Sequence, residues 1–234
     1  MKYFVSIENT SYFHWQIELL IESFKKHGLE NDLIITIAEN RSSCIPGYNK
    51  NLLSHKNKHV HAPITGPKCA NKIWALLWLL ENGQLKPPFT IIHPDMILLR
   101  PVESYQDELV FDNNQRNFPE EVYAVLENVI KQNDLLSFPL PIVGSTIIVN
   151  DIKLDLLAKV WVNIQELGKL FGESVFWNME QIAWTLTLFE EILMRGKKIS
   201  LRTETLEQTL LHHNVVNNFI HYNHGIPPAF SKYY

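Results

Sequence analysis

The first 38 residues alternate between strand and helix patterns, and this alternation constrains the fold more than any other feature of the sequence. Residues 2–7 form a short β-rich run, and residues 12–27 carry apolar side chains at helical spacing before Gly28. A second apolar run follows at residues 32–38. A strand, a helix and a strand in this order predict a βαβ unit, whose strands lie parallel in a sheet that is covered on both faces.

Later segments extend this unit into a larger domain. We expect strands at residues 59–61, 89–92 and 146–149 and near residue 220, and helices over 71–82, 120–132, 151–167 and 178–195. Residues 39–68 are polar and are expected to form a long surface segment, a kind of segment that often carries function. With 234 residues, of which 46% are hydrophobic, the chain can bury one large core. The sequence therefore predicts a single α/β domain over residues 1–234, with a mostly parallel central sheet flanked by helices.

Charge and apolar patterning exclude several classes of protein. The formal net charge is −4, so the chain has no basic footprint for nucleic acid. No run of 18 consecutive apolar residues is present, so no membrane span is expected. Met1 leads into the first strand pattern without a secretory leader, from which we expect a cytoplasmic protein. Cys44 and Cys69 lack metal-ligand spacing and are expected to be free thiols.

A His-Pro-Asp sequence directly follows the strand expected at residues 89–92. In open parallel sheets, ligands bind beyond the carboxyl ends of the strands. His93 and Asp95 are separated only by Pro94, so both side chains can face such a cleft. A hard divalent cation on Asp95 could bridge two phosphates and stabilise the charge of a leaving nucleoside diphosphate. The alternative is structural, with Asp95 capping a turn and His93 packed at the strand end.

Residues 89–102, with the sequence FTIIHPDMILLRPV, resemble the DxD-bearing strand of GT-A glycosyltransferases. The likeness is greatest to the hydroxyproline O-arabinosyltransferase and peptidyl serine α-galactosyltransferase group, in which a D-P-D-M-type strand precedes an Arg-Pro. YFHWQ at 12–16, NK at 71–72, WNME at 177–180 and IHY at 220–222 resemble that group in the same order. The resemblance implies a Rossmann-like GT-A domain. It also implies sugar transfer from a nucleoside-diphosphate donor, expected to be a UDP-sugar, to a hydroxyl of a glycan, peptide or small molecule.

The same resemblance implies a metal site, with one departure from the family's motif. Asp95 occupies the metal-binding position, with Mn²⁺ as the expected ion and Mg²⁺ as the alternative. The first aspartate of the motif is replaced by His93, which is implied to be either a nitrogen ligand or a hydrogen-bond donor. Because imidazole suits manganese less well than oxygen ligands do, the identity of the metal stays open. A histidine near the C-terminus often completes such sites; His221 matches best and His224 is the neighbouring candidate, the alternative being a structural histidine.

Further residues are expected around the donor. Ser6, Glu8 and Asn9 end the first strand, where this architecture receives the base and ribose, although ordinary strand-end capping explains them equally well. Lys72 resembles a lysine that lies near the nucleotide or sugar, with a solvated helix-start lysine as the alternative. Glu180 is the candidate acid-base or sugar-orienting carboxylate, but a glutamate in a first helical turn also stabilises that turn.

The acceptor side is expected at Gly144 and Ser145, which precede a strand and resemble an acceptor-lining segment, and at Trp177, which could stack on a sugar ring. Two other functions stay open. A catalytically silent GT-A-like domain would bind nucleotide or glycan without turnover, and the departure at His93 supports that alternative. A nucleotidyltransferase shares the α/β architecture, but no glycine-rich, lysine-containing phosphate loop follows the first strand.

Overall fold

The computed structural model of the chain describes residues 1–39, 52, 54–112, 120–141, 143–171, 179–209 and 219–221. The strands of its seven-stranded central sheet are, in chain order, β1 (Lys2–Glu8), β2 (Leu33–Ala38), β3 (Lys58–His61), β4 (Phe89–Ile91), β6 (Leu109–Asp112), β7 (Ile147–Val149) and β8 (Leu201–Glu204). They lie side by side in the order β3, β2, β1, β4, β7, β6, β8. A three-stranded sheet holds β5 (Met96–Leu98), β10 (Phe219–His221) and β9 (Glu207–Thr209), in that order.

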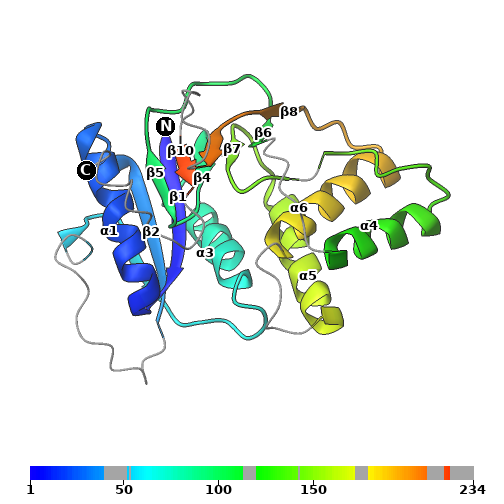
Figure 1. The fold of residues 1–234 in the computed structure, drawn as a ribbon, viewed down its shortest axis with the longest axis horizontal. Coiled ribbons are helices and arrows are strands. Elements are labelled where there is room, and N and C mark those ends of the chain that lie inside the picture. The colour runs from blue at the N-terminus through cyan, green and yellow to red at the C-terminus, as the bar shows by residue number, and fades with distance from the viewer. Residues whose placement is uncertain are drawn as a thin grey trace.

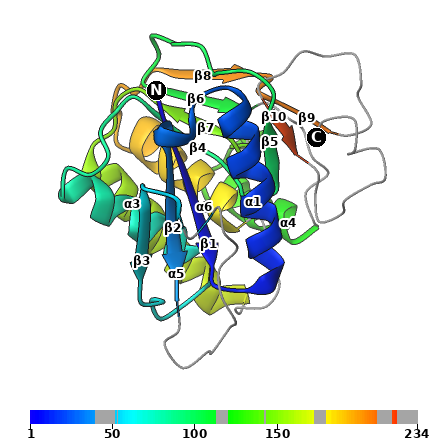
Figure 2. The ribbon, with the colours of Figure 1, turned by 90° about the vertical axis from the view of Figure 1, so that its left-hand side faces the viewer.

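Most neighbouring strands of the central sheet are parallel. β1 pairs in parallel with β2 and β4, β2 with β3, and β6 with β8, whereas β7 runs antiparallel to β4 and β6. Figure 2 shows β1, β2 and β3 side by side and running in the same direction. Helices cover both faces of this sheet (Figure 1). The predicted α/β fold, with a mostly parallel central sheet flanked by helices, is therefore confirmed.

The helices divide between the two faces of the sheet. On one face lies α1 (Ser11–Lys26), and on the other lie α3 (Ala70–Glu81), α5 (Leu154–Phe171) and α6 (Met179–Leu188) (Figure 1). α4 (Glu120–Gln132) follows β6 in the chain and contributes Leu126 to the core on the side of α3, α5 and α6. η1 (Glu30–Asp32) is a short 3₁₀ turn, and α6 continues into a π-helical segment, η2 (Phe189–Met194). Across the described ranges, no helix is both long and apolar enough to span a membrane.

Two residues set the bounds of α1. The Thr10 side chain accepts a hydrogen bond from the backbone N–H of Phe13 at 3.4 Å, which satisfies a donor that the first turn leaves open. Gly28 follows the helix with φ of 68°, a left-handed conformation that glycine adopts without strain. These two residues direct the chain from β1 through α1 to β2.

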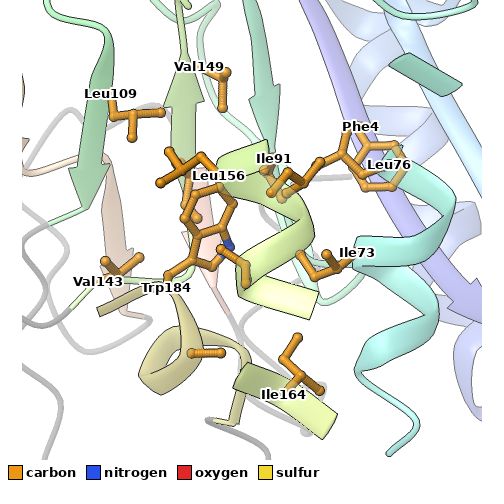
Figure 3. Packing of buried hydrophobic residues seen from close by; sticks show 14 of the residues in the cluster. Phe4, Ile73, Leu76, Ile91, Leu109, Val143, Val149, Leu156, Ile164 and Trp184 are labelled. Carbon is orange, nitrogen blue, oxygen red and sulfur yellow. The ribbon is translucent and has the colours of Figure 1, made fainter. Parts of the chain in front are cut away.

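Alternate side chains of each strand enter two separate cores. Tyr3 and Val5 pack toward α1, whereas Phe4 joins the cluster formed with α3, α5 and α6. Figure 3 shows that second cluster, in which Ile73 of α3 and Trp184 of α6 lie among strand side chains. Burial on both faces explains why β2 is apolar except at Thr36 and why the middle of β1 is apolar from Tyr3 to Val5, as parallel strands generally are.

Candidate functional site

A cleft of about 690 Å³ lies at the carboxyl edge of the central sheet. Its walls come from the end of β1, the start of α1, the N-terminus of α3, the turn after β4 and the first turn of α6. Parallel strands deliver their carboxyl ends to one edge of a sheet, and the chain leaves each strand there to enter a loop or helix. The topology therefore brings together segments that are far apart in the sequence.

Five of the side chains predicted from the sequence line this cleft: Ser6, Glu8, Lys72, His93 and Glu180. They come from β1, α3, the turn after β4 and α6, so no local pattern in the sequence places them together. Half-buried aromatic rings at the start of α1 form part of the same wall, at Tyr12 and Phe13.

An ion pair lies inside the cleft between Lys72 of α3 and Glu180 of α6. Lys72 Nζ lies 3.0 Å from Glu180 Oε1, and the two side chains are only 10% and 8% exposed. Despite this short distance, Nζ makes no hydrogen bond of good geometry within the part of the chain that the structure describes. We therefore treat the contact as an ion pair whose ammonium retains unused donors.

A second, more exposed pair lies beside the first. Lys68 Nζ lies 3.5 Å from Glu8 Oε2, with side-chain exposures of 78% and 24%. Cys69 also lines the cleft and is a free thiol, as predicted. Burial raises the pKa of its thiol to about 12, and the negative charge of Glu180 adds to the shift. A thiol with so high a pKa stays protonated at neutral pH and is a poor nucleophile. Cys44 lies outside the described residues.

The turn that carries the His-Pro-Asp sequence is fixed by contacts on both of its sides. The backbone N–H of His93 points to the sulfur of Met96 at 3.4 Å. After the turn, the N–H of Leu98 donates to Ser23 Oγ at 3.0 Å, which joins β5 to α1. His93 and Pro94 line the cleft, whereas Asp95 is 6% exposed and does not belong to the lining.

The C-terminal strand lies next to this turn. β10 pairs antiparallel with β5, and its residue His221 is opposite Met96, which directly follows Asp95. The side chain of His221 and the whole of His224 are outside what the structure describes. Among the side chains that are described, no group of three or more His, Cys, Asp or Glu residues could hold a metal ion.

Asn9 is buried in a polar chain instead of lining the cleft. Its Oδ1 lies 2.7 Å from His14 Nε2, and its Nδ2 donates to Glu39 Oε1 at 3.1 Å. This chain joins the carboxyl ends of β1 and β2 to α1, and burial lowers the pKa of His14. Asn9 was predicted at the end of β1 without either partner. The contact with Glu39 depends on the pairing of β1 with β2, and the contact with His14 depends on the turn from β1 into α1.

Gly144 and Ser145 precede β7 and do not line the cleft. A Cβ at Gly144 would collide with the backbone carbonyl oxygen of Asp112, so glycine here permits a close approach to β6. Ser145 is 4% exposed. Trp177 lies outside the described residues. The acceptor side therefore stays a prediction.

The comparisons with known proteins give only distant likeness. No protein-family model matches the chain, and no curated protein matches it. Among solved structures, the chain is similar to a glycosyltransferase involved in glycosylation of the major capsid of PBCV-1, with 11% identity, 98% and 96% of the two chains covered and a TM-score of 0.49. It is also similar to the galactosyltransferase LgtC in complex with donor and acceptor sugar analogs, with 8% identity, 98% and 88% coverage and a TM-score of 0.49.

The glycosyltransferase GlyE of Streptococcus pneumoniae gives a TM-score of 0.43, with 10% identity over 87% of this chain and 44% of that one. A likeness this distant does not decide an activity or a substrate.

Proposed function

We propose that the chain is a glycosyltransferase that moves a sugar from a nucleoside diphosphate, expected to be uridine-based, to a hydroxyl acceptor. The observation that carries the proposal is the cleft at the carboxyl edge of the sheet, which combines two lysines, two glutamates and an imidazole. Lys68 and Lys72 supply positive charge for a diphosphate, and Ser6 and Glu8 offer hydrogen-bonding groups for ribose. The specific likeness to arabinosyl- and galactosyltransferases of plant-type peptides remains a prediction.

In the proposed reaction, the bond between the anomeric carbon and the diphosphate oxygen breaks, and its electron pair leaves on the diphosphate. A new bond forms between that carbon and the acceptor oxygen, whose proton passes to a carboxylate. Of the two carboxylates that line the cleft, Glu180 is the more buried and is paired with Lys72, which supports its role as the base. Lys72 stabilises the charge that develops on the leaving group.

A divalent cation, Mn²⁺ or alternatively Mg²⁺, forms part of the proposal. Asp95 and His93 offer carboxylate and imidazole ligands from one turn, and the register of β10 beside β5 supports His221 as a third. Carboxylate and imidazole are side chains that bind divalent cations, although the imidazoles would make such a set less selective for Mn²⁺ than an all-oxygen set. When bound, the cation would neutralise the diphosphate.

The proposal is tested by screening nucleotide-sugars for release of the nucleoside diphosphate, with and without Mn²⁺. Binding should also stabilise the folded state, by about 2.7 kcal/mol when the ligand is at 100 times its Kd. If UDP plus Mn²⁺ and the other common nucleoside diphosphates leave the melting curve unchanged, the cleft is not a donor site. Binding without release of product would instead identify the catalytically silent domain.

Asp95→Asn is expected to weaken Mn²⁺-dependent UDP binding about tenfold or more, because the substitution removes a charged oxygen ligand without changing the size of the side chain. Titration calorimetry with Mn²⁺ and with EDTA measures the effect. The metal-free affinity serves as the control and should stay nearly constant. Equal losses under both conditions would show that Asp95 supports the fold of the turn and not a metal.

A companion pair of variants compares the two C-terminal histidines. His221→Ala should lower UDP affinity only when Mn²⁺ is present, whereas His224→Ala should leave it unchanged. Equal, metal-independent losses in both variants would remove the third ligand from the proposal.

A further inference from the structure

The two Lys–Glu pairs of the cleft differ in burial, and the difference bears on how substrates bind. The pair of Lys68 with Glu8 is solvated, since the lysine side chain is 78% exposed. Pairs of that kind contribute little free energy, because water and salt screen them. The pair of Lys72 with Glu180 is about nine-tenths buried on both sides, where the same charges interact more strongly.

The ammonium of Lys72 is incompletely satisfied by its carboxylate partner. Nζ is buried and makes no hydrogen bond of good geometry within the described ranges, although Glu180 Oε1 lies 3.0 Å away. An ammonium group has three donors, and leaving them unused in a buried place costs free energy. Oxygens of an anionic ligand in the cleft would accept hydrogen bonds from those donors, so the lysine can bind a second partner.

We propose that Lys72 and Glu180 form an exchangeable ion pair, which couples the two substrates. A donor phosphate draws Lys72 away from Glu180, and the carboxylate released in this way becomes available to the acceptor hydroxyl. In the empty cleft the lysine holds the carboxylate. The protein therefore completes its base only after the donor has bound, which orders the substrates as donor first and acceptor second. This inference rests on the proposed function.

The exchange of Lys72 between Glu180 and the donor phosphate has a measurable consequence for the affinity for UDP. Glu180 competes with the donor for Lys72, and its negative charge repels the diphosphate. Glu180→Gln removes both effects while keeping the size of the side chain, so UDP should bind more tightly, by about three- to tenfold for a charge interaction in a partly buried site. A merely structural ion pair would not produce tighter binding when it is broken.

Glu22→Gln is the matched control, because it removes one negative charge from an exposed pair with Lys25 on α1, outside the residues that line the cleft. We expect it to change the affinity for UDP by less than about twofold, given the small worth of exposed pairs. Lys72→Met should weaken UDP binding, since it removes the partner for which the phosphate and Glu180 compete. Calorimetric titration of UDP into the intact chain, with EDTA and with Mn²⁺, measures all three variants.

The exchange is disproved if Glu180→Gln binds UDP no more tightly than the wild type, or if Glu22→Gln tightens binding equally, which would indicate net charge alone. Should Glu180→Gln fail to fold, Glu180→Asp keeps the charge but withdraws the carboxylate by one methylene. The affinity of Glu180→Asp for UDP should then rise by a smaller factor than that of Glu180→Gln, and an unchanged affinity would overturn the proposal. A wild type that binds no nucleoside diphosphate would instead contradict the proposed function.

Discussion

Glu180→Gln is expected to lower the rate of sugar transfer by about 100- to 10,000-fold, the usual range for losing a general base. Glutamine has nearly the same shape as glutamate but cannot accept the proton of an acceptor hydroxyl. The measurement is the release of UDP at saturating UDP-sugar, with water or an added alcohol as the acceptor. Glu22→Gln is again the control and should retain most of the activity.

The same variant should affect binding and turnover in opposite directions. UDP binds more tightly because Lys72 is released, whereas the chemical step slows because the base is missing. A protein damaged in folding would lose both, so the two measurements together separate a catalytic role from a structural one. Turnover of Glu180→Gln at the wild-type rate would show that another group accepts the proton.

The sequence predicted most of the elements that have strong local signals. The first βαβ unit was predicted from apolar spacing and from Gly28, and the predicted bounds of α4 agree with the structure. Such signals arise within one element, where neighbouring residues decide the backbone conformation. They therefore do not depend on the rest of the fold.

Some short strands that depend on distant partners escaped prediction. β5 and β6 are only three and four residues long, and each is defined by strands that follow much later in the chain. The helix predicted over 151–167 spans Leu154–Phe171, and the one predicted over 178–195 ends as the π-helical segment η2. An apolar pattern does not show where i→i+5 hydrogen bonds replace i→i+4 bonds.

The candidate site was predicted in part for the same reason. Ser6, Glu8 and His93 stand at strand ends, a position that the sequence reveals. The pairing of Lys72 with Glu180 does not follow from any spacing, because α3 and α6 are brought together by packing of both helices against α5. The presence of Lys68 and Cys69 in the cleft follows from the path of the chain into α3.

Glu191→Gln is expected to destabilise the fold by about 1.5–3 kcal/mol, the worth of hydrogen bonds to a buried charged group. The Glu191 side chain is 0% exposed and forms ion pairs with Lys159, with Lys197 at 2.7 Å and with Arg195 at 3.3 Å. Its cationic partners are 27–57% exposed and can be hydrated when the charge is lost, which keeps the cost below that of a fully buried pair. Glu190→Gln is the matched control on the same segment.

The pH dependence of unfolding gives an independent measurement of the same group. Hydrogen bonds from Lys159 and Lys197 lower the pKa of Glu191 below its ordinary value of 4.5. The folded state therefore binds this proton less well than the unfolded state, and the carboxylate stabilises the fold above pH 4.5. That stabilisation is lost as the pH falls through the folded-state pKa. Burial instead raises the pKa of Glu190, so its ionised form does not stabilise the fold.

Urea titrations at neutral and acid pH measure the free energy of unfolding. The difference in this free energy between the wild type and Glu191→Gln should disappear in acid, whereas Glu190→Gln should be as stable as the wild type at neutral pH. If the difference in unfolding free energy between the wild type and Glu191→Gln stays constant across the pH range, Glu191 acts through packing and not through its charge.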